Sequence, residues 1–291
     1  MDRMHFVDAK GILTGGKGRY GMNIYRGCTH GCIYCDSRST CYHFTHAFED
    51  VEVKQNAPQL LEAALRTKRK QCMIGTGSMS DPYMHCDREL RITRRCLEVI
   101  HKYGFGATLV IKSDRILDDI DLLSEINEAS RCVVQMTLTT FDDEQALVVE
   151  PHVAPTSRRI EVLEEMHRRG IETVVWMTPI LPFINDTPDN IAQIVDACAR
   201  VGVSGIICFD MGLTLRKGDR EYYYAALDRH FPGLKDVYVR RYGLNYLLPS
   251  PRRAELMALF EDRCKAYGML YKPDECFAFI NEFPERQMSL F

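Results

Sequence analysis

The sequence predicts an α/β protein built on a parallel sheet or barrel. From residue 73 onward, short apolar runs alternate with amphipathic stretches, as they do in consecutive βα units. The apolar runs are continuous and rich in Val, Ile and Thr, which is typical of parallel strands buried on both faces. The length of 291 residues suits one barrel of about 250 residues with an extension.

Five strands are expected in this repeating part, and a sixth just before Cys28. The five are Cys72–Thr76, Ala107–Lys112, Cys132–Thr139, Glu172–Thr178 and Ser204–Asp210. Six such units place a functional site at the carboxyl ends of the strands.

Helices are expected between the strands, with residues suited to begin and end them. Asp87 or Asp114 suits an N-cap, and Gly104, Gly170 and Gly202 each follow a last periodic residue. The expected helices are Pro58–Lys68, Glu89–Tyr103, Asp114–Asn127, Thr156–Arg169 and Pro188–Arg200.

The alternation stops after about Leu215. We therefore expect a core over residues 1–215 and a C-terminal extension over residues 216–291. In the extension, helices are expected at Gly218–Phe231 and Pro251–Tyr267, with irregular segments around them.

Composition narrows the class of protein. The net charge is −3, which excludes a strongly basic surface overall but not a local basic patch. No stretch approaches the ~20 apolar residues of a membrane span. Charged residues within the first five positions do not match a signal peptide. We expect a cytoplasmic protein without a membrane segment.

Three of the twelve cysteines are clustered: Cys28, Cys32 and Cys35 lie within eight residues. In a reducing compartment such a cluster indicates a metal site rather than disulfides. Single cysteines in apolar runs are expected to be buried packing residues. They are Cys72, Cys96, Cys132, Cys198, Cys208 and Cys264.

The spacing of the triplet suits an iron–sulfur cluster. Each thiolate would bind one iron of a cubane [4Fe–4S] cluster and leave the fourth iron without a protein ligand. The alternative is a structural zinc site in a non-enzymatic interaction protein, with a nearby histidine as fourth ligand. We favour the cluster, because no second Cys/His pair of familiar spacing follows. The histidines considered are His30, His43 and His46.

The triplet, with Tyr34 before its last cysteine, resembles the signature of the radical S-adenosylmethionine (SAM) superfamily. Within it, the chain resembles the spore photoproduct lyase-like family, which is related to DNA repair photolyases. The resemblance runs from about residue 9 to residue 190. Its matching segments are residues 23–28, 75–83, 111–113, 139–140, 150–151 and 179–182.

The resemblance implies a partial (β/α)6 barrel of radical SAM type with a mainly helical C-terminal extension. Three cysteines would hold the cluster, and SAM would chelate the fourth iron. An electron from a flavodoxin- or ferredoxin-type reductant would cleave SAM to methionine and a 5′-deoxyadenosyl radical, which abstracts hydrogen. The protein would orient the reacting atoms and exclude water.

The resemblance also implies a SAM pocket. The Gly-rich segment Gly75, Thr76, Gly77 and Ser78 would receive the methionine amino group, and Tyr34 would lie against adenine. The alternatives are an ordinary strand-ending turn and a core aromatic residue.

Four more residues are expected at the cofactor. At strand ends, Lys112 suits a carboxylate or ribose oxygen, and Thr139 and Thr140 suit the ribose. Arg159 would pair with Glu150 and order the cofactor rim. The alternatives are a solvated lysine, a threonine that caps a turn, and a surface ion pair worth under ~1 kcal/mol.

One residue departs from the family pattern. Photoproduct lyases carry a hydrogen-donating cysteine after the Gly-rich strand, where this chain has Met79, whose thioether has no transferable S–H. Cys41 and Cys86 are near in sequence. The hydrogen donor, and with it the assignment as a lyase, is therefore left open.

The substrate is expected by analogy to be a nucleic-acid base, as in DNA repair. The segment Lys235–Arg253 is basic and contains Tyr238, Tyr242 and Tyr246, as a stacking and phosphate-binding surface would. The alternative is that these tyrosines pack inward. A protein, an RNA or a small metabolite is the other substrate class.

The last five residues, Gln287–Phe291, resemble the peptide by which bacterial DNA-maintenance proteins dock on the replicative sliding clamp. Leu290 and Phe291 would fill an apolar pocket while Gln287 forms hydrogen bonds beside it. The alternative is that the two apolar residues fold back onto the chain's own surface.

Overall fold

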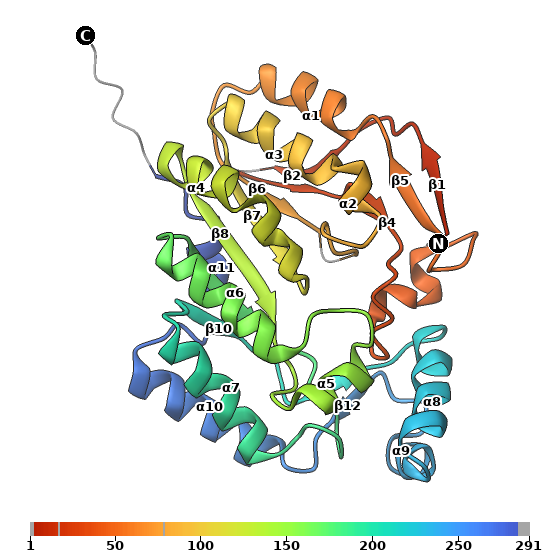
Figure 1. Cartoon of the computed structure of the whole chain (residues 1–291). Helices are drawn as coiled ribbons and strands as arrows, with labels where there is room; N and C mark the ends of the chain where they lie inside the picture. Colours follow the sequence, from red (N-terminus) through yellow and green to blue (C-terminus); the bar gives the residue numbers. More distant parts are fainter. Residues whose placement is uncertain (1–2, 17, 78, 285–291) are drawn as a thin grey trace.

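A seven-stranded sheet forms the centre of the computed structural model, which describes residues 3–16, 18–77 and 79–284 (Figure 1). The strand order is β10-β9-β8-β7-β6-β3-β2, and every neighbouring pair is parallel except the β2–β3 hairpin. The strands are β2 (Leu13–Gly16), β3 (Arg19–Met22), β6 (Met73–Thr76), β7 (Gly106–Ile111), β8 (Cys132–Thr137), β9 (Glu172–Trp176) and β10 (Gly205–Ile207). The six expected parallel strands are present, and the α/β fold class is confirmed.

Five helices lie at the expected places along the chain and share the main hydrophobic core with the strands. Gly104, Gly170 and Gly202 follow the ends of their helices with φ of 68°, 69° and 78°, a conformation that glycine adopts without strain. The helices are α1 (Ala57–Arg66), α3 (Ile92–Lys102), α4 (Ile120–Ala129), α6 (Thr156–Arg168) and α7 (Pro188–Arg200).

Two expected helices begin differently from the prediction. The helix expected from Glu89 is divided into α2 (Asp87–Leu90) and α3, because Arg91 has a left-handed φ of 48°. The Asp87 carboxylate accepts from the first two backbone N–H groups of α3, so this residue caps α3. The first turn expected from Asp114 is a 3₁₀ helix, η3 (Asp114–Asp119), whose cap is the Ser113 hydroxyl.

The two faces of the sheet have different neighbours. On β8, Cys132, Val134 and Met136 face the helices and belong to the main core, as do the other five single cysteines, which are all buried. The alternate residues face the inside of the partial barrel, where Gln135 donates to the Thr108 hydroxyl at 2.7 Å. The barrel interior is therefore partly polar.

Helix α11 (Pro273–Asn281) closes the end of the barrel at which the strands begin. Its side chains Cys276 and Ile280 pack against inward-facing residues of four strands. The Arg131 guanidinium donates to the backbone carbonyls of Phe279 and Glu282 at 2.6 and 2.8 Å. The strand residues in this cluster are Met73, Val133, Val174 and Ile207.

The sequence analysis missed several shorter elements. A three-stranded sheet of order β1-β5-β4 lies beside the barrel, and α11 and a short helix α9 lie where irregular chain was expected. Helices α8 and α10 match the two expected helices of the extension. The additional elements are β1 (Met4–Val7), β4 (Tyr25–Arg26), β5 (Val51–Lys54), η1 (Asp36–Arg38), η2 (Thr40–Tyr42), α5 (Asp143–Val149), β11 (Gly212–Thr214), α8 (Asp219–His230), α9 (Leu234–Tyr242), β12 (Leu247–Pro249) and α10 (Arg253–Tyr267).

The expected stacking surface in the extension is not formed. Tyr238 and Tyr242 are buried on α9 and their rings contact other tyrosines of α8 and α9, so the inward-packing alternative is confirmed for both. Only Tyr246 is exposed, and the Arg216 guanidinium lies 4.8 Å from its ring centre. The tyrosine hydroxyls hydrogen-bond one another and nearby carbonyls, which makes burial favourable.

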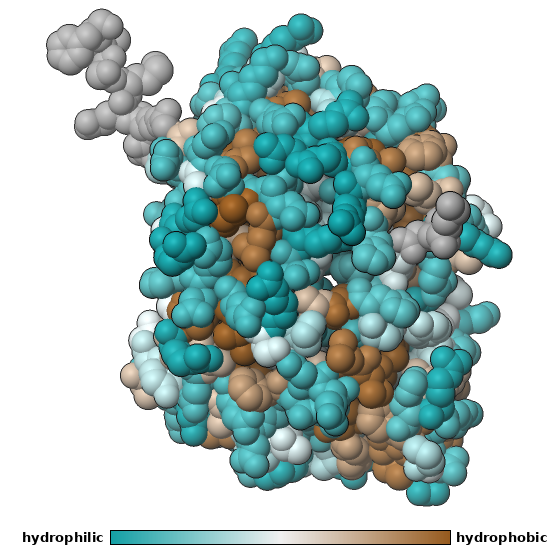
Figure 2. Space-filling model, viewed as in Figure 1, coloured by the Kyte–Doolittle hydropathy of each residue, from teal (hydrophilic) through white to brown (hydrophobic). Residues whose placement is uncertain are grey.

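The visible surface is mostly hydrophilic, with smaller hydrophobic patches (Figure 2). Over the ranges that the structure describes, no helix is long and apolar enough to cross a membrane. Ser78 and the docking segment Gln287–Phe291 lie outside the described residues. The role of each, and the division at residue 215, stay predictions.

Replacing Ile280 by Ala tests the role of α11. The side chain is 2% exposed, so its loss should lower the free energy of unfolding by about 3 kcal/mol in urea denaturation. Glu275→Ala, on the exposed face of the same helix, should change it by less than ~0.5 kcal/mol. Equal effects of the two substitutions would show that α11 does not stabilise the barrel.

Candidate active site

The three clustered cysteines lie on an irregular, mostly buried loop at the carboxyl end of the sheet. Distant residues hold its backbone: the Cys28 N–H donates to Phe48 O at 3.1 Å, and the Ile33 N–H to Val149 O at 3.0 Å. Gly27 makes the first approach possible, because a Cβ there would lie 2.5 Å from the Phe48 carbonyl oxygen. Backbone hydrogen bonds to two distant segments therefore hold the loop in place.

The three thiols share one pocket of about 60 Å³, which Met79, Asp81 and Lys112 also line. Burial raises the pKa of the Cys28 thiol to about 12 and that of Cys32 well above its usual value. Ligation would require loss of these protons.

The spacing of the sulfur atoms discriminates between a cluster and a single zinc ion. Two thiolates on one zinc ion lie at most about 4.6 Å apart. Among the described residues, no set of three metal-binding donors within 4.8 Å of one another includes a cysteine. The loop therefore fits three ligands on separate irons better than one shared ion. As placed, His30, His43 and His46 form no such set with these cysteines among the described residues.

Gly75 and Thr76 of the Gly-rich segment end β6, and Gly77 directly after them lies against Asn23. A Cβ on Gly77 would lie 1.7 Å from the Asn23 side-chain oxygen, so these two residues are in direct contact. That oxygen is buried and accepts no hydrogen bond within the described part of the chain. Thr76 uses its hydroxyl to accept from the Val110 N–H at 2.9 Å, so it braces β7. Gly75 lies in β6, beside β7.

Lys112 follows β7 and carries a cation into the pocket. Its ammonium donates to the Thr137 hydroxyl at 3.3 Å and lies 6.0 Å from the centre of the Tyr34 ring. Burial opposes the charge, but Cys32, Glu150 and other acidic groups outweigh it and raise the lysine pKa. The backbone N–H of Lys112 donates to the buried Asp81 carboxylate at 2.6 Å.

Glu150 and Arg159 form a buried pair, so the surface-pair alternative is wrong. Both side chains are 1% exposed, and their nearest N–O distance is 2.5 Å. The Tyr34 hydroxyl donates to the other oxygen of Glu150. Burial opposes ionisation of Glu150, but Arg159 and Lys112 hold its pKa below the usual value. Tyr34 is therefore fixed through its hydroxyl.

Thr139 is buried, with a hydroxyl that has no hydrogen-bond partner among the described residues. Its carbonyl accepts from the side-chain amides of Asn185 and Asn190, both at 2.9 Å. It does not line the cysteine pocket or the large cavity beside it. The expected contact with a ribose stays a prediction.

A cavity of about 680 Å³ adjoins the cysteine pocket and shares Cys35 and Lys112 with it. The far wall includes β11, β12 and the half-exposed Phe209, whose ring stacks on Phe277 of α11. Arg253 donates to Asp210 at the same wall. The volume is that of a typical small-molecule site.

Sequence reasoning missed several of these lining residues. Asp81 lines the cysteine pocket and Asn23 contacts Gly77. Both lie in the matching segments and follow strands, and that position was the available signal. Phe209 follows a recognised strand, but Arg253 reaches the cavity only because α10 returns to the barrel.

Met79 lies in the cysteine pocket, 3.9 Å from the Ser37 hydroxyl. Within the described ranges, only Cys28, Cys32 and Cys35 among the cysteines line the pocket or the large cavity, so neither Cys41 nor Cys86 does. Among the described residues, no thiol besides the three proposed cluster ligands is therefore positioned there as a hydrogen donor.

Substitution of Glu150 by Gln would leave Arg159 as a buried, unpaired cation. We expect the free energy of unfolding to fall by about 3 kcal/mol in urea denaturation. Glu255→Gln removes an exposed partner of Arg252 and should cost less than ~1 kcal/mol. Similar small losses in both variants would contradict the central role of the buried pair.

Comparisons with known proteins identify the family of this chain. Residues 22–198 match the radical SAM superfamily. An uncharacterized protein of Mycobacterium tuberculosis is 27% identical over 243 residues, which cover 80% of this chain and 70% of that protein. An uncharacterized protein of Methanocaldococcus jannaschii is 29% identical over 170 residues, which cover 58% of this chain and 62% of that protein.

The fold is similar to that of spore photoproduct lyase. Its complex with dinucleoside spore photoproduct has a TM-score of 0.66 and 13% identity, covering 93% of this chain and 81% of that one. A double mutant with bound AdoMet and the same dinucleoside has a TM-score of 0.64 and 13% identity, covering 87% and 76%. Because the superfamily match spans more than half of the sequence, this chain belongs to the radical SAM superfamily and is an enzyme whose cofactors are a [4Fe–4S] cluster and SAM.

Proposed function

We propose that this radical SAM enzyme holds its cluster with Cys28, Cys32 and Cys35 and abstracts hydrogen from a nucleic-acid base. The observation that carries the proposal is the continuity of the cysteine pocket with the large cavity. When bound, the cluster and SAM supply a 5′-deoxyadenosyl radical. The residues around them bind, orient and exclude water.

The loop suits a cluster with one open iron. It offers three thiols at separations too wide for a single zinc ion, and the pocket offers no fourth cysteine within the described residues. Burial keeps competing water away from the sulfur atoms.

The residues around the pocket suit SAM. The unpaired Asn23 oxygen can accept from an ammonium group, and the bare backbone at Gly75 and Gly77 permits a close approach. Lys112 offers a cation to the SAM carboxylate or ribose. The proposed SAM contacts are Tyr34, Gly75, Thr76, Gly77, Ser78, Lys112 and Thr139, with Arg159 acting through Glu150 on Tyr34.

The large cavity suits a flat aromatic substrate. Tyr34, Tyr42 and Phe209 line it with rings, and Lys112 and Arg253 line it with cations. The likeness in fold to spore photoproduct lyase also supports a DNA-repair-like role. Because Met79 has no transferable S–H, we do not extend the proposal to a cysteine-dependent lyase step.

Radical SAM enzymes need an electron donor. We propose that it is of the flavodoxin or ferredoxin type. DNA is the proposed macromolecular partner, and the sliding clamp is a further predicted partner through Gln287–Phe291.

The test is reductive cleavage of SAM in the presence of deuterated candidate substrates. Reduced, cluster-replete protein should contain about four irons and form 5′-deoxyadenosine, with deuterium transferred from an oligonucleotide. Cys28→Ala/Cys32→Ala/Cys35→Ala should lose iron and activity together, whereas the exposed Cys41→Ala should retain both.

The outcomes separate the two parts of the proposal. A full cluster in the triple variant would refute the assignment of the ligands. Formation of 5′-deoxyadenosine with deuterium from a peptide or metabolite, and none from oligonucleotides, would refute only the substrate class.

Substitution of Gly77 by Ala tests the SAM pocket. The new methyl group would displace the Asn23 side chain, so SAM affinity in equilibrium dialysis should fall at least about tenfold while iron content is unchanged. Gly11→Ala, where nothing lies within 4 Å, is the control. Unchanged SAM affinity in Gly77→Ala would exclude this segment from the cofactor site.

A further inference from the structure

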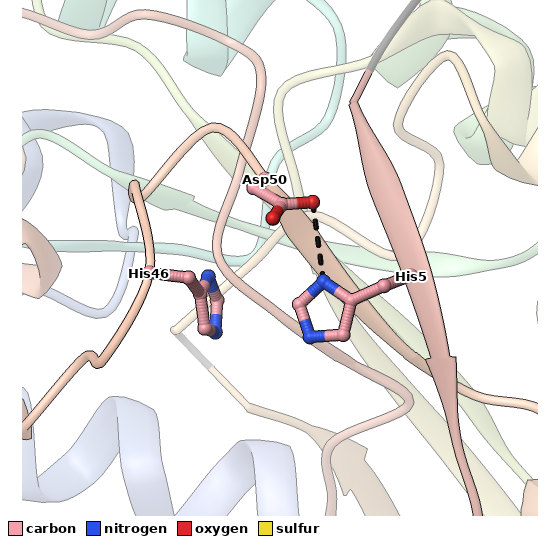
Figure 3. Close-up of side chains that lie close together, drawn as sticks. All are labelled: His5, His46 and Asp50. Carbon is pink, nitrogen blue, oxygen red and sulfur yellow. Dashed lines mark hydrogen bonds and ion pairs between the residues drawn. The ribbon is translucent and has the colours of Figure 1, made fainter.

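A second group of metal-binding side chains lies away from the cysteines, between β1 and the segment before β5. His5 projects from β1 toward His46 and Asp50 (Figure 3). The His5 Nδ1 lies 3.1 Å from an Asp50 oxygen, and the two imidazole rings lie edge to face with centres 4.7 Å apart. One donor atom from each residue lies within 4.8 Å of the other two.

His46 is arranged as a metal ligand. Its Nδ1 lies 2.9 Å from the Ala47 carbonyl oxygen, which can only accept, so this nitrogen carries the proton. In the neutral imidazole this arrangement leaves the lone pair on Nε2, an atom that is buried without a hydrogen-bond partner among the described residues. Ligating histidines typically donate their other N–H to a carbonyl in this way.

Glu52 on β5 supplies a second carboxylate beside the group. One of its oxygens lies 3.9 Å from His46 Nε2 and 3.8 Å from an Arg26 nitrogen. Because Glu52 also pairs with the Arg26 guanidinium, it suits a secondary ligand rather than one of the three main donors. Two imidazoles and one carboxylate form the primary donor set.

We propose that His5, His46 and Asp50 bind one divalent cation of the zinc class, with water or Glu52 in the fourth position. Imidazole and carboxylate donors match zinc, and the two carboxylates balance its charge. The three donor atoms lie within 4.8 Å of one another, and donors on one zinc ion lie at most about 4.2 Å apart. The His5 and Asp50 side chains are 39% and 31% exposed, so both have room to adjust around an ion.

The position of this site gives the cation a structural role. β1 is an edge strand that pairs only with β5 among the described strands, and the cation would join it to the segment containing His46. Phe48, in the same segment, accepts from the Cys28 backbone N–H. The cation would therefore brace the chain next to the cysteine loop without contacting the cluster.

The test uses cluster-replete protein purified anaerobically, loaded with Zn²⁺ and desalted. Elemental analysis should find about one zinc besides about four irons per chain. His5→Ala, His46→Ala and Asp50→Asn should each weaken zinc binding at least about tenfold with iron unchanged. His230→Ala, which removes an exposed histidine elsewhere, should retain the zinc.

A second measurement distinguishes zinc bound at His5, His46 and Asp50 from zinc bound by cysteines that hold no cluster. In the variant without Cys28, Cys32 and Cys35, Zn²⁺ should still bind at one equivalent, and Co²⁺ should give visible absorption without a thiolate band. Loss of zinc in that variant, or its retention in all three site variants, would overturn the proposal. If the two alanine variants fail to fold, Asp50→Asn still tests the site, because this substitution preserves the shape of the side chain.

Discussion

The Glu150 carboxylate holds together the parts of the chain that form the site. It accepts from the Tyr34 hydroxyl on the cysteine loop and pairs with the Arg159 guanidinium on α6. Arg159 in turn donates to the backbone carbonyls of Thr137, at the end of β8, and Ala154. A fully buried charge must be paired to be tolerated, so these groups fix one another. The cysteine loop is irregular and lacks the repeating hydrogen bonds of a helix. The buried charge pair therefore helps to hold it in place through Tyr34.

The same loop depends on contacts with both sides of the barrel. Phe48 accepts a hydrogen bond from Cys28, while Val149, next to Glu150, accepts one from Ile33. Buried backbone groups need such partners because water cannot reach them. The proposed cation at His5 would act on the first of these contacts and the buried ion pair on the second. The geometry of the cysteines is therefore set by segments that carry none of the proposed cluster ligands.

The predictable parts of this structure are those whose signal is local. Continuous apolar runs identified the parallel strands, and glycines such as Gly104 identified helix ends, because both depend on neighbouring residues. The cysteine spacing and the family resemblance located the candidate site. Helix α11 was missed because its apolar residues pack against the barrel interior, a contact between distant parts of the chain that no local pattern indicates. Tyr238 is buried through hydroxyl partners that no local pattern reveals, such as the Pro182 carbonyl.

The placement of α11 has a consequence for how the chain is made. Val133, Val174 and Ile207 face the barrel interior and are covered by a helix that begins only at Pro273. During synthesis the sheet strands leave the ribosome well before that helix does, so these apolar side chains stay uncovered until α11 emerges. Phe277, on the same helix, also supports Phe209 in the wall of the large cavity. The cavity that faces the cysteines is thus completed late, and an unfinished chain has neither a closed core nor a finished site.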